Sequence, residues 1–147
     1  MADTIATAAR QVRCPVAATL DVVGDRWTLL IIRDLLRGYS RFSQLQQSVE
    51  GITTSMLSDR IKRLESEGVI ERRFYSDHPP RAEYVLTSKG HGLGVVVGAL
   101  SAWGEEHTEH DLTLISSDCG HHVMPLYHCP TCNIPVQKSH VRIVESS

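Results

Sequence analysis

Long hydrophobic runs are missing from this 147-residue sequence. The longest apolar run, from Leu93 to Trp103, is too short to span a bilayer and is interrupted by glycines. The segment from Met1 to Cys14 has no apolar core of the kind that a signal peptide needs. We therefore expect a cytoplasmic protein with no membrane partner, and 41% hydrophobic residues suffice to bury one core.

Catalytic signatures are missing as well. The sequence contains no HExxH pair for a zinc hydrolase, no phosphate-binding glycine loop and no recognisable pairing of a nucleophile with a base. A thiol oxidoreductase would place the CxxC of Cys129 and Cys132 at the start of a helix packed on a sheet. Pro130, Asn133 and Pro135 favour a turn there instead. We therefore do not expect an enzyme.

An overall excess of positive charge is absent too, since the net charge is −2. The charge is unevenly divided along the chain. Residues 10–90 contain 13 Lys and Arg against 10 Asp and Glu, a net charge of +3, whereas residues 91–147 contain 2 against 6, a net charge of −4, and Asp3 supplies the remaining −1. We expect a polyanionic partner to bind the first part of the chain, with an affinity that falls as salt rises.

A polar-faced helix followed at once by a basic hairpin occupies residues 51–87. Thr53 or Thr54 caps the start of the helix, and Gly68 ends it. An apolar stripe at spacings of four and three faces a core, and it consists of Leu57, Ile61 and Leu64. The residues that we expect to meet a DNA major groove are Thr54, Ser55, Met56, Ser58, Asp59, Lys62 and Arg63. An ordinary amphipathic surface helix has the same pattern, so this segment alone leaves both readings open.

The hairpin after this helix favours DNA recognition. Residues 69–75 predict its first strand, residues 76–81 a turn stiffened by Pro79 and Pro80, and residues 82–86 the returning strand. The cations that we expect to contact the DNA backbone or minor groove are Arg72, Arg73, His78 and Arg81. A charged hairpin can also serve only to protect a sheet edge from pairing. A hairpin joined directly to a polar-faced helix is, however, typical of a wing.

Two helices upstream complete the pattern. Residues 26–37 predict an apolar helix closed by Gly38, and Ser43 caps a short helix over residues 44–49. The turn of residues 50–51 leads into the recognition helix. The side chains expected in the core are Trp27, Leu30, Ile31, Leu35, Leu36, Phe42, Leu45 and Val49. This order predicts a mainly α fold with a small β-hairpin wing, a winged helix-turn-helix of the α+β class.

Four motifs follow one another in a characteristic order: a CPV start at Cys14, a GDRWT turn, an RFxxL segment and a PPRxEYxLTxxG wing, with Trp103 after them. In these motifs the chain from Cys14 to His107 resembles the HxlR-type bacterial transcription regulators, a winged-helix group near the MarR regulators. The resemblance implies a homodimer that binds double-stranded DNA at a palindromic operator and responds to a chemical signal such as a small-molecule effector. Ser55 departs from the family, in which many members have a cation there, so the preferred base sequence does not carry over.

These patterns divide the chain into three parts. Residues 1–13 are an N-terminal arm, residues 14–110 the winged helix-turn-helix domain for DNA binding and dimerisation through N- and C-terminal helices, and residues 111–147 a short Cys/His-rich tail. We predict a sequence-specific transcriptional regulator that represses by steric hindrance. The alternatives are a thiol/disulfide redox protein that uses the CxxC of the tail, and a winged helix that binds other proteins.

Residues 88–107 predict the last helix of the domain. Its glycines, which leave room for another backbone, are Gly90, Gly94, Gly98 and Gly104. Its apolar stripe at helical spacing consists of Leu93, Val96, Val97, Leu100 and Trp103. We expect Leu93, Val97, Leu100 and Trp103 to form a dimer interface with the helix before Gly24. The alternative is that the stripe covers the core of its own subunit.

Cys14 is a candidate redox sensor. It precedes Pro15, which favours the first turn of a helix, and it follows Arg13. Helix amides and a neighbouring cation favour the reactive thiolate form of such a cysteine, and the resembling family contains members whose cysteine at this position senses oxidants or electrophiles. The alternative is a small buried hydrophobic residue.

The tail contains a candidate metal site. Cys129 and Cys132 form a CPTC knuckle, and Cys119 with a nearby histidine completes the ligand set of one structural zinc ion. Spacing alone does not decide among the histidines, and we select His121. A zinc-ribbon-like element is therefore one reading of the tail. A redox disulfide between Cys129 and Cys132 and an inert tail without metal are the other two.

Overall fold

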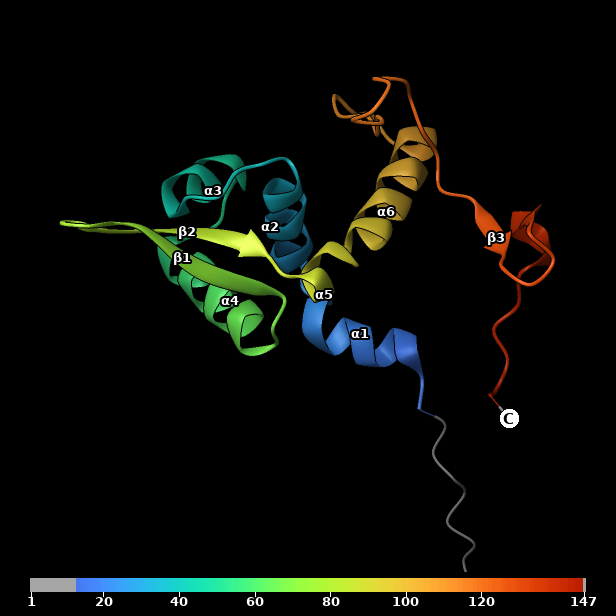
Figure 1. Ribbon diagram of the computed structural model, residues 1–147, viewed down its shortest axis with the longest axis horizontal. Coiled ribbons are helices and arrows are strands. Elements are labelled where there is room, and N and C mark those ends of the chain that lie inside the picture. Colours follow the sequence, from blue (N-terminus) through green and yellow to red (C-terminus); the bar gives the residue numbers. More distant parts are fainter. Residues whose placement is uncertain (1–12, 147) are drawn as a thin grey trace, which may run out of the picture.

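The computed structural model describes residues 13–146, so the arm of residues 1–13 lies almost wholly outside the described residues. The first part of the chain contains α1 (Pro15–Val23), α2 (Arg26–Leu36), α3 (Phe42–Ser48), α4 (Thr54–Ser66), β1 (Ile70–Asp77), β2 (Pro80–Leu86), α5 (Ser88–His91) and α6 (Gly94–His107). The tail adds β3 (Tyr127–Cys129), β4 (Ile134–Val136) and a short 3-10 helix, Lys138–His140. Helices arranged around one antiparallel hairpin confirm the predicted winged α+β fold (Figure 1).

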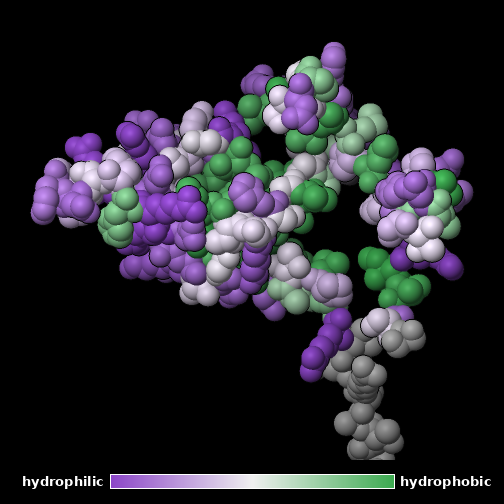
Figure 2. Space-filling model, in the orientation of Figure 1, coloured by the Kyte–Doolittle hydropathy of each residue, from purple (hydrophilic) through white to green (hydrophobic). Residues whose placement is uncertain are grey.

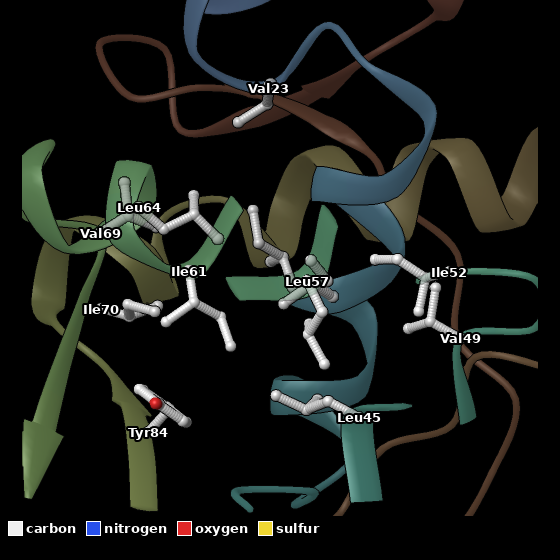
Figure 3. Packing of buried hydrophobic residues seen from close by; sticks show 12 residues of the cluster. Val23, Leu45, Val49, Ile52, Leu57, Ile61, Leu64, Val69, Ile70 and Tyr84 are labelled. Carbon is white, nitrogen blue, oxygen red and sulfur yellow. The ribbon is translucent and has the colours of Figure 1, made fainter. Parts of the chain in front are cut away.

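One hydrophobic core lies between α2, α3, α4 and the hairpin (Figure 3). The stripe predicted for α4 is confirmed, because Leu57, Ile61 and Leu64 are at most 2% exposed. The inward face of α2 differs from the prediction: Ile32 is buried beside Ile31, and Leu36 is 38% exposed. The expected core residues of α2 that are only partly buried are Trp27, Leu30 and Leu35.

The face of α2 is shifted because the helix also buries a carboxylate. Asp34 is fully buried, and its Oδ1 accepts hydrogen bonds from Arg33 Nε at 2.9 Å and from Arg37 Nη1 at 3.2 Å. A buried charge is tolerated only where it is paired and hydrogen-bonded. The spacing of apolar residues along α2 does not predict this group of one carboxylate and two arginines. The inward face of α2 therefore differs from the one expected.

The ends of α2 and α4 are defined by side-chain caps. Asp25 Oδ1 accepts hydrogen bonds from the backbone amides of Trp27 and Thr28, both at 3.0 Å, at the start of α2. Thr53 caps α4 by accepting the amide of Met56 at 3.1 Å. Gly68 ends α4 with φ of +69°, as predicted. These caps define where each helix begins and where α4 ends.

The hairpin is longer than predicted. Its ladder continues past a bulge between Phe74 and Ser76 to the pair Asp77 and Pro80, so the turn contains only His78 and Pro79 instead of residues 76–81. The bulge admits an extra residue and lets pairing resume beyond it, which the turn residues alone do not indicate. On its other edge, β2 is held to the segment after α2, since Tyr84 N donates to Ser40 O at 2.7 Å.

The single helix predicted over residues 88–107 is divided into α5 and α6. Gly90 lies against the backbone of Val69, and a Cβ there would clash with the Val69 carbonyl oxygen. The close approach expected of the glycines therefore occurs at Gly90, at the end that docks on the hairpin. Gly94 and Gly98 face the side chains of Leu36 and Leu114 instead. Of the helices in the described residues, none has the length and apolar content needed to cross a bilayer.

Candidate nucleic-acid interface

The outer face of α4 presents most of the residues predicted to meet DNA. Because the three apolar side chains of its inner stripe are buried, the opposite face is turned outward. The exposed members are Thr54, Ser55, Asp59, Lys62 and Arg63, and the half-buried ones are Met56 and Ser58. Small hydroxyl side chains at the start of the helix permit close approach of another molecule, and Lys62 lies two turns further along.

Two arginines of α4 contact the first helices. Arg60 Nε donates to Asp25 Oδ1 at 3.1 Å, and Arg63 donates to the backbone carbonyl oxygen of Asp21. Partial burial of Asp25 favours its neutral form, but hydrogen bonds from Thr28 and Arg60 outweigh it and lower the pKa of this carboxyl below its ordinary value of 3.8. These contacts fix α4 against α1 and α2. Arg60 is a positioning residue that the sequence did not reveal, because its partner is 35 residues away.

The arginines of the wing point to opposite faces of the hairpin. Arg72 Nη2 lies 3.1 Å from Glu65 Oε1 of α4, and its guanidinium lies over the Tyr84 ring at 5.6 Å from the centroid. Arg73 Nε donates to Glu71 Oε1 at 2.8 Å. Because successive residues of a strand alternate between faces, the two arginines do not act as one clamp in this arrangement. Arg72 joins the wing to α4.

The tip of the wing carries the other predicted cations. His78 and Arg81 are exposed, and Arg81 pairs across the hairpin with Ser76. Within residues 13–146, neither Arg81 nor Lys62 forms an ion pair. Both side chains are therefore available for phosphate groups.

Arg41 was missed by the sequence reasoning, although it belongs to the RFxxL segment. It precedes α3, and its guanidinium lies over the Tyr75 ring of the wing at 5.1 Å from the centroid. Arg41, Ser43, Tyr75 and Arg81 line a shallow depression between α3 and the wing. Figure 2 shows hydrophilic side chains over the wing and its neighbouring helices, whereas hydrophobic side chains gather toward α6 and the tail.

The remaining predicted sites are distributed over α1 and α6. Cys14 is exposed in the single subunit, at the residue before α1. Leu93 and Val97 pack against the core of their own subunit, as the alternative for this stripe proposed. Leu100 and Trp103 are 54% and 63% exposed. The stripe of α6 is therefore divided between an internal face and an outward one.

The tail places its cysteines in two turns. Cys119 belongs to the turn closed by Gly120 and is followed by His121, whereas Cys129 and Cys132 belong to the second turn. Hydrogen bonds from Ser116 and His121 lower the pKa of the Cys119 thiol, and those from the backbone amides of Cys132 and Thr131 lower that of Cys129. In the part of the chain that the structure describes, no three His, Cys, Asp or Glu side chains are grouped to hold a metal ion. The zinc site stays a prediction.

Known proteins with this arrangement are transcriptional regulators. Residues 22–112 match the family of HxlR-like helix-turn-helix proteins. The chain is 37% identical over 121 residues to the uncharacterised HTH-type transcriptional regulator Rv3095 of Mycobacterium tuberculosis, covering 80% of this chain and 76% of the relative. It is 39% identical over 92 residues to the uncharacterised regulator YtcD of Bacillus subtilis, covering 63% of this chain and 73% of the relative.

Solved structures show the same architecture. The crystal structure of PA1607, described as a transcription factor, matches with a TM-score of 0.77 and 31% identity, over 92% of this chain and 97% of that one. The reduced form of the regulator YodB from B. subtilis matches with a TM-score of 0.56 and 33% identity, over 67% and 99%. The redox regulator HypR in its reduced form matches with a TM-score of 0.60 and 34% identity, over 63% and 92%. The chain belongs to the HxlR-like helix-turn-helix family of DNA-binding transcriptional regulators.

Proposed function

We propose that this regulator acts as a homodimer that represses transcription by occupying a palindromic operator. One observation carries the proposal: the exposed hydroxyl face at the start of α4 lies next to a wing whose tip cation, Arg81, has no ion-pair partner among the described residues. Each subunit inserts α4 into a major groove, and the wing lies along the flanking backbone. A polymerase is then excluded from the same DNA.

The proposed contacts with DNA are of two kinds: some side chains hold the protein on the phosphate backbone, and others lie against the bases and recognise the sequence. Lys62, Arg81 and Arg41 contact phosphates, because their charges are exposed beside α4 and the wing. Thr54, Ser55 and Ser58 lie where α4 approaches the base edges. Asp59 accepts a hydrogen bond from Arg60 at 2.9 Å, so its negative charge is partly neutralised where α4 approaches DNA. Arg63 and Arg72 join α4 to α1 and to the wing, and Arg73 is paired with Glu71 of its own strand.

A second copy of the chain supplies the other half of the interface. Val95 and Leu100 of α6 are 73% and 54% exposed, and Val16 and Leu20 of α1 are 52% and 55% exposed. Apolar residues exposed together on two helices mark an association surface. Dimerisation through this surface presents two copies of α4, and the net charge of +3 in residues 10–90 is doubled on the DNA side.

The test is footprinting on the DNA upstream of the regulator's own gene and of its nearest divergent neighbour. We expect two protected half-sites related by a two-fold axis, with centres about 34 Å or one helical turn apart. A single unpaired footprint, or protection that does not depend on sequence, would reject the dimeric operator. Sedimentation of the free protein at micromolar concentration, performed in parallel, measures the dimer independently of DNA.

Thiol stress is the second candidate signal. Cys14 is exposed immediately before α1, next to the apolar residues proposed for the dimer surface. Two related structures are of proteins whose descriptions concern oxidation, namely the redox regulator HypR and the diamide-treated form of YodB. We infer that the angle between subunits changes when Cys14 is alkylated or forms a disulfide with a second thiol, the oxidant taking up the two electrons and two protons released. Diamide is expected to release the operator from the wild type and to have no effect on Cys14→Ser, and an equal response of both proteins would remove Cys14 from the mechanism.

A further inference from the structure

Two turns of the tail have the same backbone conformation at an offset of thirteen residues. Gly120 N donates to Ser116 O at 2.8 Å, and Asn133 N donates to Cys129 O at the same distance. The residue that closes each turn is left-handed, with φ of +73° at Gly120 and +55° at Asn133. The first turn is therefore a structural repeat of the second, in which Ser116 occupies the position of Cys129.

Short antiparallel pairings flank both turns. Cys129 pairs with Ile134 in β3 and β4. In the first turn, Ser116 N donates to His121 O at 2.9 Å, and the next pair outward is Ile115 with His122. The two segments therefore resemble each other in the residues that flank the turns as well as in the turns themselves. Both segments are small hairpins with a CxxC-type tip, and in the first tip one of the two cysteines is replaced by serine.

In both tips a backbone amide donates to the first side chain of the turn, from the fourth residue in the second turn and from the third residue in the first. Cys132 N donates to Cys129 Sγ at 3.5 Å in the second turn. In the first turn, Asp118 N donates to Ser116 Oγ at 3.2 Å. Backbone amides directed at the first side chain of such a turn stabilise a sulfur or oxygen that carries negative charge, as a metal ligand does. Ser116 Oγ therefore occupies the place in the first turn that Cys129 Sγ has in the second, and it lies beside the Cys119 thiol, to which it is hydrogen-bonded.

The tail has no hydrophobic core that would hold the two hairpins. None of residues 109–146 is buried, and Ile115, Leu126 and Tyr127 are 57%, 69% and 53% exposed. A segment of this size folds stably only with a disulfide, a metal ion or a protein partner. The four cysteines are free thiols. Among these possibilities, a metal ion accounts for the repeated turns, because CxxC-type tips present pairs of ligands to one ion.

We propose that the tail binds one Zn²⁺ through the thiolates of Cys119, Cys129 and Cys132, with Ser116 at the fourth corner of the tetrahedron. An oxygen atom, from the Ser116 hydroxyl or from a water molecule that it holds, completes the coordination. The His121 side chain hydrogen-bonds to Cys119, but His121 corresponds in the repeat to Ile134, which follows its turn, so we assign His121 as a neighbour of the site and Ser116 as the fourth position. The site is independent of the DNA interface, and it retains zinc less tightly than a site with four thiolates.

Zinc binding brings the two turns together. The first turn is attached to α6, because Glu105 Oε2 lies 2.8 Å from His122 Nε2 and Glu105 Oε1 accepts the amide of Leu114 at 3.0 Å. The second turn is connected to it through residues 123–126, which the structure places outside any strand (Figure 1). The second turn closes on the first when the thiolates coordinate, in the same way that metal binding is coupled to folding in other small domains.

Metal content is the first measurement. The full chain is purified without a histidine tag and analysed by elemental mass spectrometry. We expect one zinc ion per chain in the wild type and almost none in Cys129→Ser, with the thermal unfolding of the winged domain unchanged as evidence that the variant is folded. A wild type that neither contains zinc nor binds added Zn²⁺ at micromolar concentration overturns the proposal. One zinc ion per two chains overturns the site within one tail, because it places the ion between subunits.

The fourth corner is tested by adding a thiolate. Ser116→Cys is expected to slow the release of zinc to a chelator by about tenfold or more, because even groups around metal ligands change affinity by that factor. Ser117→Cys is the matched control, since it adds a thiol one residue outside the repeated position and is expected to behave as the wild type. His121→Ala is expected to keep its zinc. Equal release from the two cysteine variants, or loss of zinc in His121→Ala, overturns the assignment of Ser116.

Discussion

Individual cations around α4 differ in what they already contact. Arg63 is bound to a backbone carbonyl oxygen of α1, and Arg72 to Glu65, whereas Lys62 and Arg81 are exposed and have no ion pair within the described residues. Exposed ion pairs contribute only about 0–1 kcal/mol, so they do not prevent a side chain from turning to DNA. They do mean that removing Arg63 or Arg72 alters the domain as well as the interface. Arg81 is the cleaner probe of phosphate contact.

Arg81→Ala is expected to weaken binding to all DNA sequences about equally. Loss of one phosphate contact reduces the slope of log affinity against log salt by about 1, and the exposed side chain contributes within about 0.5 kcal/mol to stability. Fluorescence anisotropy with operator and random duplexes over a range of salt concentrations measures both effects. Lys138→Ala, which removes the same charge from the tail, is the control. An unchanged salt slope in Arg81→Ala would show that the wing tip does not touch the backbone.

Asp25 connects pH to stability. Its folded-state pKa lies below the ordinary 3.8, since hydrogen bonds from Thr28 and Arg60 outweigh the opposing effect of partial burial. The stabilisation by the carboxylate is therefore fully present above pH 3.8 and is lost as pH falls through the lower folded-state value. At neutral pH, Asp25→Ala is expected to cost about 0.5–2 kcal/mol through loss of the helix cap.

Urea unfolding between pH 2.5 and 7 measures this contribution. Asp25→Asn keeps a capping oxygen but cannot ionise, so its stability is expected to fall less steeply than that of the wild type below pH 4. Ser66→Ala, at the exposed end of α4, serves as a control for substitution without a change in charge. Parallel acid unfolding curves of wild type and Asp25→Asn would assign the low-pH transition to other carboxylates.

At the scale of elements, the sequence predicted the order of helices and strands because periodicity and capping residues are local signals. The ends of α4 at Thr53 and Gly68 and its buried stripe are confirmed. The predictions that were wrong depended on distant contacts. The helix predicted over residues 88–107 is broken at Gly92 and Leu93, just after Gly90 packs against the backbone of Val69, and α2 buries Asp34 beside two arginines. Likewise, the contact of Arg60 with Asp25 requires two helices to be packed first, so nothing in the spacing of these residues predicts it.

Gly90→Ala tests the contact that positions α5 on the hairpin. A Cβ at this position would clash with the carbonyl oxygen of Val69 and lie 2.9 Å from Leu86 Cδ2. Because the backbone cannot move away without loosening the hairpin, we expect a loss of about 1–3 kcal/mol. Chemical denaturation of the purified variant measures it.

Gly104→Ala provides the matched control within α6. Its Cβ would meet only Thr108 Oγ1, at 3.6 Å, so the substitution is expected to be neutral or to stabilise by up to about 1 kcal/mol. If both variants had the same stability as the wild type, the break between α5 and α6 would have another cause than the close approach at Gly90.

The whole molecule separates its charges from its apolar surface. Basic residues are concentrated in residues 10–90, which have a net charge of +3, whereas residues 91–147, where α6 and the tail lie, have few basic residues and a net charge of −4. Figure 2 shows the corresponding division between a hydrophilic side at the wing and hydrophobic patches toward α6 and the tail. A dimer formed through α6 therefore directs both wings away from the interface and toward DNA. In such a dimer, a substitution in the exposed apolar face of α6 is expected to change both the oligomeric state and the affinity for DNA.

Leu100→Glu is expected to separate the subunits without unfolding them. Leu100 is 54% exposed, so a carboxylate there remains hydrated in a single subunit but would be buried without a partner in a dimer. Sedimentation velocity should show a monomer at concentrations where the wild type is dimeric, and operator affinity should fall because each subunit then binds one half-site alone. Gln47→Glu, which adds the same charge at an exposed position of α3, should leave sedimentation unchanged. If Leu100→Glu remained dimeric, the apolar face of α6 would cover something other than a second copy, and the palindromic operator would lose its structural basis.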